Sequence, residues 1–193
     1  SDRGSGDFIP ALESLEEQYF SVRKMMSKKW ESAQFIPYLQ AHTNTYAPLE
    51  IIREKIEPVM KKEGVVGLNI ATRADCLEAD VCEYLASLAE RTVLTVELGL
   101  QSSSDATAER INRGHTWAQF CEGFRALRAA SGRIGICVHL IFGLPGETDE
   151  MMMESVRRVA ALHPDQVKLH LLHVIRGTKM AEEYLAGNYT PLE

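Results

Sequence analysis

Short segments of alternating hydrophobic and polar residues recur along the chain, separated by longer segments with helical spacing. The most regular short segment covers residues 93–101. Because successive residues of a strand point to opposite faces, one face is aliphatic and the other polar or small. The aliphatic face carries Leu94, Val96, Leu98 and Leu100, and the other face carries Thr95, Glu97, Gly99 and Gln101. Parallel strands in α/β proteins are usually apolar on both faces, so this division predicts a strand that lines a cavity or a ligand site.

Other segments repeat this division of faces, and helical patterns lie between them. The further strands are predicted at residues 35–41, 65–71, 134–142 and 167–172. Helical spacing of apolar residues predicts helices at residues 11–30, 48–64, 77–91, 117–130, 149–162 and 180–186. Pro58 is expected to kink or shorten the second of these helices. Strands that alternate with helices in this way form right-handed βαβ units and a parallel sheet.

The polar faces of all the predicted strands point to the same side, and this arrangement indicates the fold class. Helices on one side of a sheet and a polar interior on the other are typical of a barrel or half-barrel rather than of a doubly wound sheet. We therefore expect an α/β fold in one domain over residues 1–193. Ligands of such folds bind at the carboxyl ends of the strands. The residues that collect there are Gln40, His42, Thr43, Asn69, Arg73, Glu97, Gln101, His139, Gly143, Lys168 and His170.

Composition and charge agree with an ordinary globular protein and disfavour some partners. Of the 193 residues, 45% are hydrophobic and 25% are charged, and the net charge is −6. An acidic chain is not typical of an autonomous nucleic-acid-binding domain, which usually carries a basic excess. No apolar stretch reaches the roughly 18–20 residues that span a bilayer, and the four cysteines form no CxxC pair. We expect a reduced, cytoplasmic protein with no membrane partner.

Two features near the predicted strand ends favour a ligand site, and each has a structural alternative. Three serines and Asp105 could cap a short helix whose N–H groups bind an anion, with Arg113 adding a charged fork. The alternative is an ordinary capped helix behind a packed barrel strand. Glu97 would need a partner if it is buried, because an unpaired buried carboxylate is costly. Arg73, Lys168 or a cationic ligand could supply that partner, and a purely structural ion pair is the alternative.

The remaining candidates are two histidines and a cysteine on the predicted inner face. His139 and His170 have neither HxH nor HxxxH spacing, which argues against a metal site. Cys137 has no acid–His relay beside it in the sequence, so we interpret it as a small core residue rather than a nucleophile.

Five sequence motifs occur in a fixed order between residues 40 and 181. They read QAHTNTYA (40–47), GLNIATRADCL (67–77), VELGLQ with INRGH (96–101 and 111–115), HLIFGLPGE (139–147) and KLHLLHVIRGTKMA (168–181). With these motifs the chain closely resembles the radical S-adenosylmethionine (SAM) superfamily over residues 35–186, and within it the YhcC-like Fe–S oxidoreductases. It is similar, more distantly, to elongator-type and coproporphyrinogen-type radical SAM enzymes.

The resemblance implies a fold, cofactors and roles for individual residues. The fold would be a partial (βα)6 TIM-like barrel in which a CxxxCxxC loop after the first strand holds a 4Fe–4S cluster that binds SAM. The resemblance places the backbone of Gln40, His42 and Thr43 at the methionine part of SAM. It implies that Glu97 and Gln101 are the SAM contacts of the fourth barrel strand, and that Arg113 binds the SAM carboxylate. Around the ribose and adenine it places His139, Ile141, Gly143 and His170.

This sequence departs from the family pattern at one point. It contains no CxxxCxxC, and its four cysteines cannot form one. We therefore expect a fragment of a radical SAM core domain that covers strands two to six and begins just past the cluster loop. Such a fragment would bind no cluster and be inactive, whereas its parent would reductively cleave SAM to a 5′-deoxyadenosyl radical. The alternative is a non-catalytic barrel module that binds a nucleotide or a partner protein.

The resemblance also bears on the substrate and on assembly. Similarity to elongator-type enzymes points to tRNA, through a wobble uridine, and a small molecule is the alternative. Without a first strand, residues 35–41 would form an unpaired edge, and the interior around Asn69, Glu97 and His139 would open to water. We expect residues 11–30 to fold back over that edge or to exchange with a second copy, which would make a homodimer.

Overall fold

Five parallel strands pair in the order β1-β2-β3-β4-β5 in the computed structural model, which describes residues 14–30 and 33–192. The strands are β1 (Tyr38–Leu39), β2 (Gly67–Thr72), β3 (Val93–Gln101), β4 (Gly135–Phe142) and β5 (Gln166–Leu171). Each strand is parallel to its neighbours. The α/β fold and the parallel sheet predicted from the alternation of strands and helices are confirmed.

Helices connect the strands and lie close to their predicted positions. They are α1 (Leu15–Ser27), α2 (Leu49–Met60), α3 (Ala79–Ala89), α4 (Asp105–Arg110), α5 (Trp117–Ala130), α6 (Asp149–Ala160) and α7 (Lys179–Leu185), with a 3-10 turn η1 (Ala74–Cys76). Side-chain caps explain several starts, since the oxygens of Ser14, Thr116 and Thr148 each accept a backbone N–H from the first turn. The helix α2 contains Pro58 and ends two residues later, short of the predicted residue 64.

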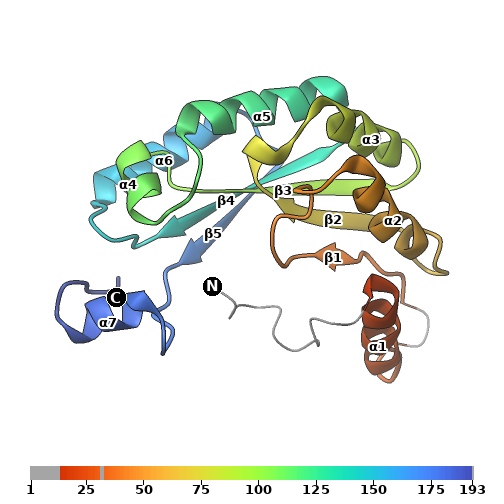
Figure 1. Cartoon of the computed structure of the whole chain (residues 1–193), viewed down its shortest axis with the longest axis horizontal. Coiled ribbons are helices and arrows are strands. Elements are labelled where there is room, and N and C mark those ends of the chain that lie inside the picture. Colours follow the sequence, from red (N-terminus) through yellow and green to blue (C-terminus); the bar gives the residue numbers. More distant parts are fainter. Residues whose placement is uncertain (1–13, 31–32, 193) are drawn as a thin grey trace.

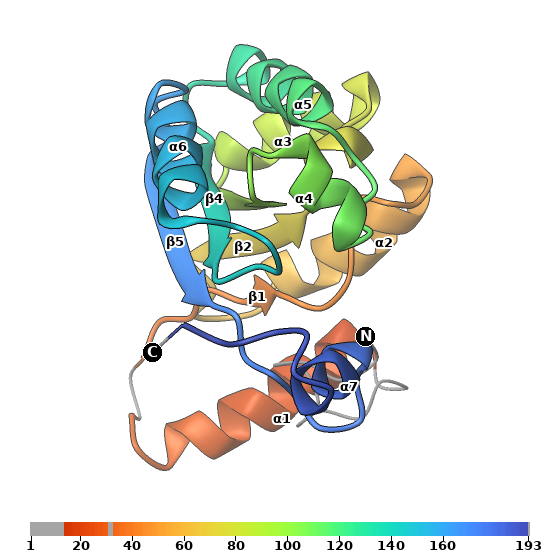
Figure 2. The ribbon, with the colours of Figure 1, turned by 90° about the vertical axis from the view of Figure 1, so that its left-hand side faces the viewer.

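The aliphatic faces of the central strands pack against α3, α5 and α6, which cover one side of the sheet in both views (Figures 1 and 2). Leu68, Val96 and Val138 have no exposed area and belong to the same core as Leu88 of α3 and Phe120 of α5. Burial of an aliphatic side chain of this size contributes about 1.5–3 kcal/mol. This core fixes which face of the sheet is apolar and leaves the opposite face to polar side chains.

The strand β5 is an exception to the predicted helix cover. Val167, Leu169 and Leu171 are 45%, 58% and 54% exposed. Val167 and Leu169 pair in register with Val138 and Leu140 of β4, which are fully buried. The helix that follows β5 is α7, and it lies on the other side of the sheet, below it in Figures 1 and 2. The aliphatic row of β5 therefore lacks the cover that the inner strands have.

The strand β1 is much shorter than the predicted 35–41. Only Tyr38 and Leu39 form a strand, and Phe35 adds an isolated parallel bridge. Pro37 interrupts the ladder because it has no N–H to donate, although its carbonyl accepts a hydrogen bond from the backbone of Asn69 at 2.9 Å.

The helix α1 packs beside the start of that segment. The rings of Tyr19 and Phe35 lie edge to face with centroids 6.1 Å apart, and the Tyr19 hydroxyl donates to the carbonyl of Glu63. This contact agrees with a fold-back of the helix at the first residue of the predicted edge strand. Exchange between copies, and hence the homodimer, stays a prediction.

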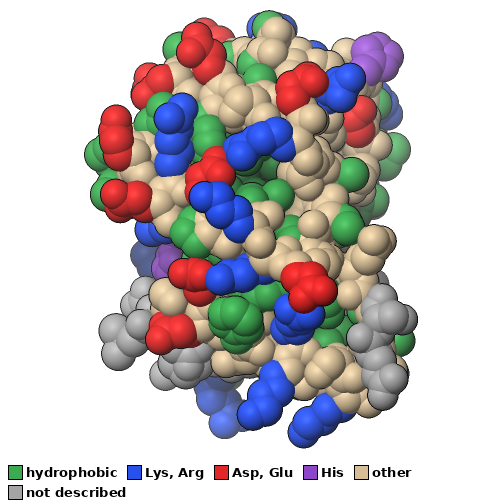
Figure 3. Space-filling view, turned by 90° about the vertical axis from the view of Figure 1, so that its right-hand side faces the viewer, with side chains coloured by type: hydrophobic (Ala, Val, Ile, Leu, Met, Phe, Trp, Pro, Cys, Tyr) green, Lys and Arg blue, Asp and Glu red, His purple; other side chains and the backbone are tan. Residues whose placement is uncertain are grey.

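The end of the molecule that carries α1 and α2 has a mixed surface. Figure 3 shows Lys and Arg side chains interspersed with Asp and Glu on this end, with small hydrophobic patches between them. Interspersed charges of both signs are typical of a solvent-facing surface. Within the described residues, no helix has both the length and the apolar character needed to cross a membrane.

Candidate functional site

A buried carboxylate stands at the centre of the polar face of the sheet. Glu97 of β3 is 2% exposed, and its oxygens accept hydrogen bonds from the Tyr38 hydroxyl and from Nε2 of His139, both at 2.7 Å. Nζ of Lys168 donates to both carboxylate oxygens at 2.7 Å. We call Tyr38, Glu97, His139 and Lys168 the closed cluster. Its members come from β1, β3, β4 and β5, so the cluster ties four strands together.

The closed cluster is electrically balanced. Burial raises the pKa of Glu97, but hydrogen bonds from Lys168, Tyr38 and His139 outweigh burial, and this pKa lies below its ordinary value. Burial also lowers the pKa of His139, although Glu97 favours the charged imidazole. Burial and the carboxylate raise the pKa of Tyr38. At neutral pH one carboxylate therefore faces one ammonium, with a neutral imidazole and a neutral phenol as further donors.

These contacts decide between the partners that the sequence allowed for Glu97. Lys168 is the partner, whereas Arg73 pairs with Asp75, with Nε donating to Oδ1 at 2.9 Å. The expectation that the interior around Glu97 is open to water is wrong for this residue, which is 2% exposed. Nδ2 of Asn69 donates to Oε1 at 3.5 Å as a fourth donor beside Tyr38, His139 and Lys168.

Two residues of the closed cluster, together with Cys137 beside it, form a possible set of metal ligands. Glu97, Cys137 and His139 place one ligand atom each within 4.8 Å of one another. However, the Lys168 ammonium already lies on both carboxylate oxygens, where a cation would bind. Burial and the charge of Glu97 raise the pKa of Cys137 to about 11, which disfavours the thiolate that a metal needs. We interpret the closed cluster as a structural ion pair.

A second group of polar residues lies at the carboxyl end of β3. The register with β4 shifts between Gly99 and Gln101. Gln101 has a φ of +76°, a left-handed conformation that is uncommon for residues other than glycine. Its amide oxygen Oε1 is buried and has no hydrogen-bond partner in the described part of the chain. A buried polar group without a partner costs about 1–3 kcal/mol, so this oxygen marks a place where a donor from a ligand would fit.

Arg113 and Gln101 both lie beside Gly99. A Cβ on this glycine would be 2.7 Å from Nη2 of Arg113 and 3.1 Å from Nε2 of Gln101. The Arg113 guanidinium donates from Nε to the Gly99 carbonyl at 2.9 Å, and from Nη2 to the same oxygen. Burial and the charge of Arg73 lower the pKa of Arg113 to about 10.

The charges of Arg73, Asp75 and Arg113, near the carboxyl end of β3, do not cancel. Arg73 and Asp75 form an ion pair, while no described carboxylate lies within ion-pair distance of Arg113. These three side chains together carry one net positive charge. We call Arg73, Gln101 and Arg113 the open cluster, because it holds an unneutralised charge and an unpaired acceptor.

The start of α4, considered above as an anion site, is occupied by the chain itself. The hydroxyl of Ser104 accepts a hydrogen bond from the backbone of Thr107 at 3.3 Å, and Asp105 accepts one from the backbone of Trp117 at 2.7 Å. The helix has only six residues. The structure therefore contains an ordinary capped helix at this point, which was the alternative interpretation.

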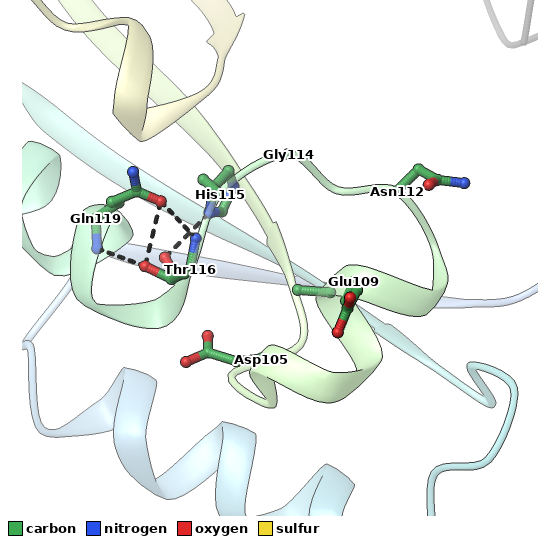
Figure 4. A pocket seen from close by; sticks show the side chains of 8 residues that line it. Asp105, Glu109, Asn112, Gly114, His115, Thr116 and Gln119 are labelled. Atoms are coloured by element: carbon green, nitrogen blue, oxygen red, sulfur yellow. Dashed lines mark hydrogen bonds between the residues drawn. The ribbon is translucent and has the colours of Figure 1, made fainter.

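A hollow of about 480 Å³ lies between α4 and the start of α5 (Figure 4). Asp105 and Glu109 lie on its α4 side, and both are exposed. On its α5 side, Thr116 and Gln119 form a capping box, each bonding the other's backbone. No residue that the sequence predicts to bind SAM lines this hollow. We interpret it as a surface feature beside the open cluster.

The loop after β1 carries the residues predicted near the methionine part of SAM, Gln40, His42 and Thr43. Its anchor is Asn44, whose Nδ2 donates at 2.8 Å to the carbonyls of Leu39 and Ala71, at the ends of β1 and β2. The loop therefore lies at the carboxyl end of the sheet. Asn44 is not among the predicted site residues, although an asparagine just after a strand is a common former of turns.

The residues predicted near the adenine lie on β4 and β5 and in the turn after β4, and are Ile141, Gly143 and His170. His170 is exposed, with its ring centroid 5.1 Å from that of His139. Gly143 is buried, and both of its backbone groups are engaged. Its N–H donates to Sδ of Met152 at 3.3 Å, and its carbonyl accepts from the Tyr189 hydroxyl at 2.7 Å. An adenine contact at Gly143 is thus left with the nonpolar surface of this residue.

The ten predicted residues therefore fall into separate groups. Glu97 and His139 belong to the closed cluster, and Gln101 and Arg113 belong to the open cluster. The other six lie in the loop after β1 and near the ends of β4 and β5, and the cofactor role of all ten stays a prediction. Asp75 was missed, although its spacing from Arg73 along the chain allows a bidentate pair.

Two family models match this chain. The radical SAM superfamily model matches residues 14–159, and the radical SAM C-terminal domain model matches residues 164–193. The chain belongs to the radical SAM superfamily. It is 46% identical to YtqA of Bacillus subtilis (strain 168), over 97% of this chain and 58% of that protein. It is 34% identical to YhcC of Escherichia coli (strain K12), over 93% of this chain and 57% of that protein. The chain thus spans less than two thirds of the length of these relatives.

A further relative and a solved structure extend the comparison. The chain is 32% identical to the tRNA uridine(34) acetyltransferase of Methanocaldococcus jannaschii, over 65% of this chain and 23% of that protein. Its structure is similar to that of the archaeal Methanocaldococcus infernus Elp3 with an N-terminal deletion, with a TM-score of 0.73 and 19% identity over 93% of this chain and 49% of that chain. At this identity the likeness shows the fold, which is that of the TIM-like barrels of radical SAM proteins.

Proposed function

We propose that this chain is the SAM-binding part of a larger radical SAM enzyme, whose 4Fe–4S cluster is held by residues outside this chain. When bound, that cluster supplies the electron for the reductive cleavage of SAM. The observation that carries the proposal is the open cluster. There a buried amide oxygen, without a partner among the described residues, lies close to a half-buried guanidinium that no described carboxylate neutralises.

The open cluster complements the amino acid part of SAM. This part carries one carboxylate and one ammonium group. A guanidinium binds a carboxylate through two parallel hydrogen bonds, and an amide oxygen accepts a hydrogen bond from an ammonium. Arg113 uses Nε and Nη2 on the Gly99 carbonyl, and its Nη1 has no partner in the described residues. Arg113 and Gln101 therefore fit SAM in both charge and hydrogen bonding.

The cysteines of this chain do not fit an iron–sulfur cluster. Cys76, Cys82, Cys121 and Cys137 are buried and free, and they belong to four different elements, η1, α3, α5 and β4. Burial raises the pKa of each thiol, whereas cluster ligands are thiolates that lie close together. We assign no step of the reaction to these cysteines.

In this proposal the residues of the chain bind and orient SAM. Arg113 holds the carboxylate and Gln101 the ammonium, while the closed cluster keeps the sheet rigid beneath them. The rest of SAM is contacted by Gln40, His42, Thr43, His139, Ile141, Gly143 and His170. Holding a reactant in one pose lowers the barrier through orientation alone.

We further propose that the longer protein acts on tRNA. The support is the similarity to a protein named tRNA uridine(34) acetyltransferase. Binding of tRNA to the longer protein should weaken steeply with salt, because each phosphate contact releases counterions. Filter binding over a salt series measures this dependence. Absent or salt-insensitive binding would favour a small-molecule substrate.

The test of SAM cleavage uses the longer natural protein that contains this chain, loaded anaerobically with iron and sulfide. Reduction in the presence of SAM should release 5′-deoxyadenosine, measured by liquid chromatography. Arg113→Met should weaken SAM binding roughly 10- to 150-fold, since a charged hydrogen bond contributes about 1.5–3 kcal/mol. The matched control is Arg125→Met, which removes an exposed arginine of α5.

The outcomes separate the two functions. A cluster-loaded protein that releases no 5′-deoxyadenosine refutes the proposed activity. A protein that takes up no cluster at all would instead favour the non-catalytic module that binds a nucleotide or a partner protein.

A further inference from the structure

Arg73 follows directly after β2 and reaches the loop that carries Arg113. Its Nη2 donates to the carbonyl of Gly114 at 2.9 Å. Gly114 has a φ of +84°, and a Cβ at this position would lie 3.0 Å from both Nη1 and Nη2 of Arg73. The backbone of the loop formed by residues 113–115 therefore packs against the Arg73 guanidinium and is hydrogen-bonded to it.

Asp75 holds that guanidinium in place. Nε and Nη2 of Arg73 donate to the two carboxylate oxygens at 2.9 Å and 2.5 Å, which is the bidentate geometry that fixes an arginine most firmly. The two side chains are 29% and 21% exposed, so the pair is partly shielded from solvent. Burial raises the pKa of Asp75, but the hydrogen bonds and charge of Arg73 bring it below its ordinary value. Nη1 of Arg73 is left without a partner in the described residues.

Arg73 and Arg113 are held close enough to repel each other. After burial, the charge of Arg73 is the next cause that lowers the pKa of Arg113. Asp75 neutralises only one of the two positive charges. A ligand group with one negative charge would relieve this repulsion and neutralise the net positive charge of Arg73, Asp75 and Arg113.

We propose that Arg73 is a positioning residue for SAM. Held by Asp75, it supports the loop of Arg113 through Gly114 and adds the second positive charge that the SAM carboxylate neutralises. The inference rests on the proposed function, because it names how the same site selects a carboxylate. Recognition of the carboxylate then depends on Arg73 as well as on Arg113.

The experiment compares two ligands on the cluster-loaded longer protein. Equilibrium dialysis measures the affinity for SAM and for the analogue that lacks only the carboxylate. Arg73→Gln should weaken SAM binding roughly 10- to 100-fold, the range expected for a lost charge-assisted contact. The affinity for the decarboxylated analogue should change less than about threefold, because this ligand has no charge for Arg73 to recognise.

Three further variants separate positioning from folding. Arg73→Lys keeps the charge but loses the fork, so it should restore part of the affinity for SAM. Asp75→Asn should give an intermediate loss, since Arg73 keeps its charge but loses its anchor. Arg91→Gln removes an arginine that is paired in the same way with Glu57, away from the site, and should change neither affinity. Hydrogen exchange at the amides of residues 113–115 should be faster in Arg73→Gln than in the wild type.

The binding results separate the role of Arg73 from the existence of the SAM site. If Arg73→Gln loses affinity for both ligands equally, or for neither, the inference is overturned while the proposed function stands. If the wild type binds SAM no better than the decarboxylated analogue, the carboxylate site itself is wrong. If the cluster-loaded wild type binds no SAM, the proposed function fails together with the inference.

Discussion

The closed and open clusters lie on the same face of β3, with Glu97 and Gln101 four residues apart, but they differ in how their polar groups are satisfied. Glu97 has a cation and three neutral donors around it. At the end of the strand, within residues 14–30 and 33–192, the amide oxygen of Gln101 has no partner and the Arg113 guanidinium bonds only to a backbone carbonyl.

The difference follows from position in the sheet. In the middle of β3, regular register brings side chains from neighbouring strands onto Glu97. The register shifts between Gly99 and Gln101, and beyond that point no described residue supplies a partner for the amide oxygen of Gln101. Strain and unsatisfied groups of this kind collect at functional sites. In mid-strand the protein itself supplies the partners of Glu97, whereas we propose that a ligand supplies them at the end of the strand.

The largest effect is expected from removing the cation of the closed cluster. Lys168→Met keeps much of the aliphatic stem but leaves Glu97, whose side chain is 1% exposed, without an opposite charge. Removal of one partner of a buried pair costs about 3–5 kcal/mol. The Lys168 side chain is 39% exposed, so we expect a smaller loss of about 2–3 kcal/mol in the free energy of unfolding. Urea denaturation followed by circular dichroism measures it.

Two variants control this result. Arg157→Met breaks an exposed pair with Glu150 on α6 and should leave the urea midpoint unchanged. The double variant Glu97→Leu with Lys168→Met should recover much of the loss, because an apolar pair can replace a buried ion pair. Equal losses in the single and double variants would show that Lys168 does not act by neutralising Glu97.

A methyl group on Gly99 should affect the open cluster alone. It would lie 2.7 Å from Nη2 of Arg113 and 3.1 Å from Nε2 of Gln101, so both side chains must move. Both are flexible at these ends, and the sheet can stay in place. In Gly99→Ala we expect SAM affinity to fall about tenfold, or roughly 1.4 kcal/mol, and the free energy of unfolding to change by less than about 1 kcal/mol.

The matched control for that variant is Gly135→Ala in β4. Gly135 pairs with Thr95 and lies on the polar face of the sheet, as Gly99 does. Its added Cβ would meet atoms no closer than 3.4 Å, an ordinary contact. Dialysis against SAM and urea denaturation should both give wild-type values. If Gly99→Ala loses stability but keeps its affinity for SAM, the open cluster supports the fold and does not bind SAM.

Local sequence patterns predicted the helices, the strands and the direction of side chains better than they predicted the tertiary contacts. Alternation along β3 placed Glu97 and Gln101 on the polar face, because side-chain direction in a strand is a local property. The choice of Lys168 over Arg73 as partner of Glu97 depends on the registers of β3 with β4 and of β4 with β5. No pattern within one segment contains that information.

Two further features of the site could not be read from a local sequence pattern. The Tyr189 hydroxyl donates a hydrogen bond to the carbonyl of Gly143, which is 46 residues away in the sequence. The unpaired oxygen of Gln101 results from an irregularity that a hydrophobic pattern does not reveal. By contrast, the short β1 follows from Pro37, a residue whose effect on a strand is known from the sequence.

The smallest effect concerns the pH dependence of the closed cluster. Burial lowers the pKa of His139 below 6.5 in the folded protein. Between that lowered value and 6.5 the unfolded chain binds more protons, so stability rises with pH and this contribution is complete above about 6.5. Glu97, whose pKa is also lowered, contributes stability that is present above about 4.3 and is lost as the pH falls through its folded value.

His139→Gln keeps an N–H donor for Glu97 and cannot titrate in this range. It should therefore flatten the rise in the free energy of unfolding between pH 5 and 6.5, by less than about 1 kcal/mol. Some slope should remain, because burial and Arg113 also lower the pKa of His115. Urea denaturation from pH 5 to 7.5 measures the curve, and His115→Gln should remove the remaining part. If His139→Gln keeps the full wild-type slope, His139 is not the neutral donor that a balanced closed cluster requires.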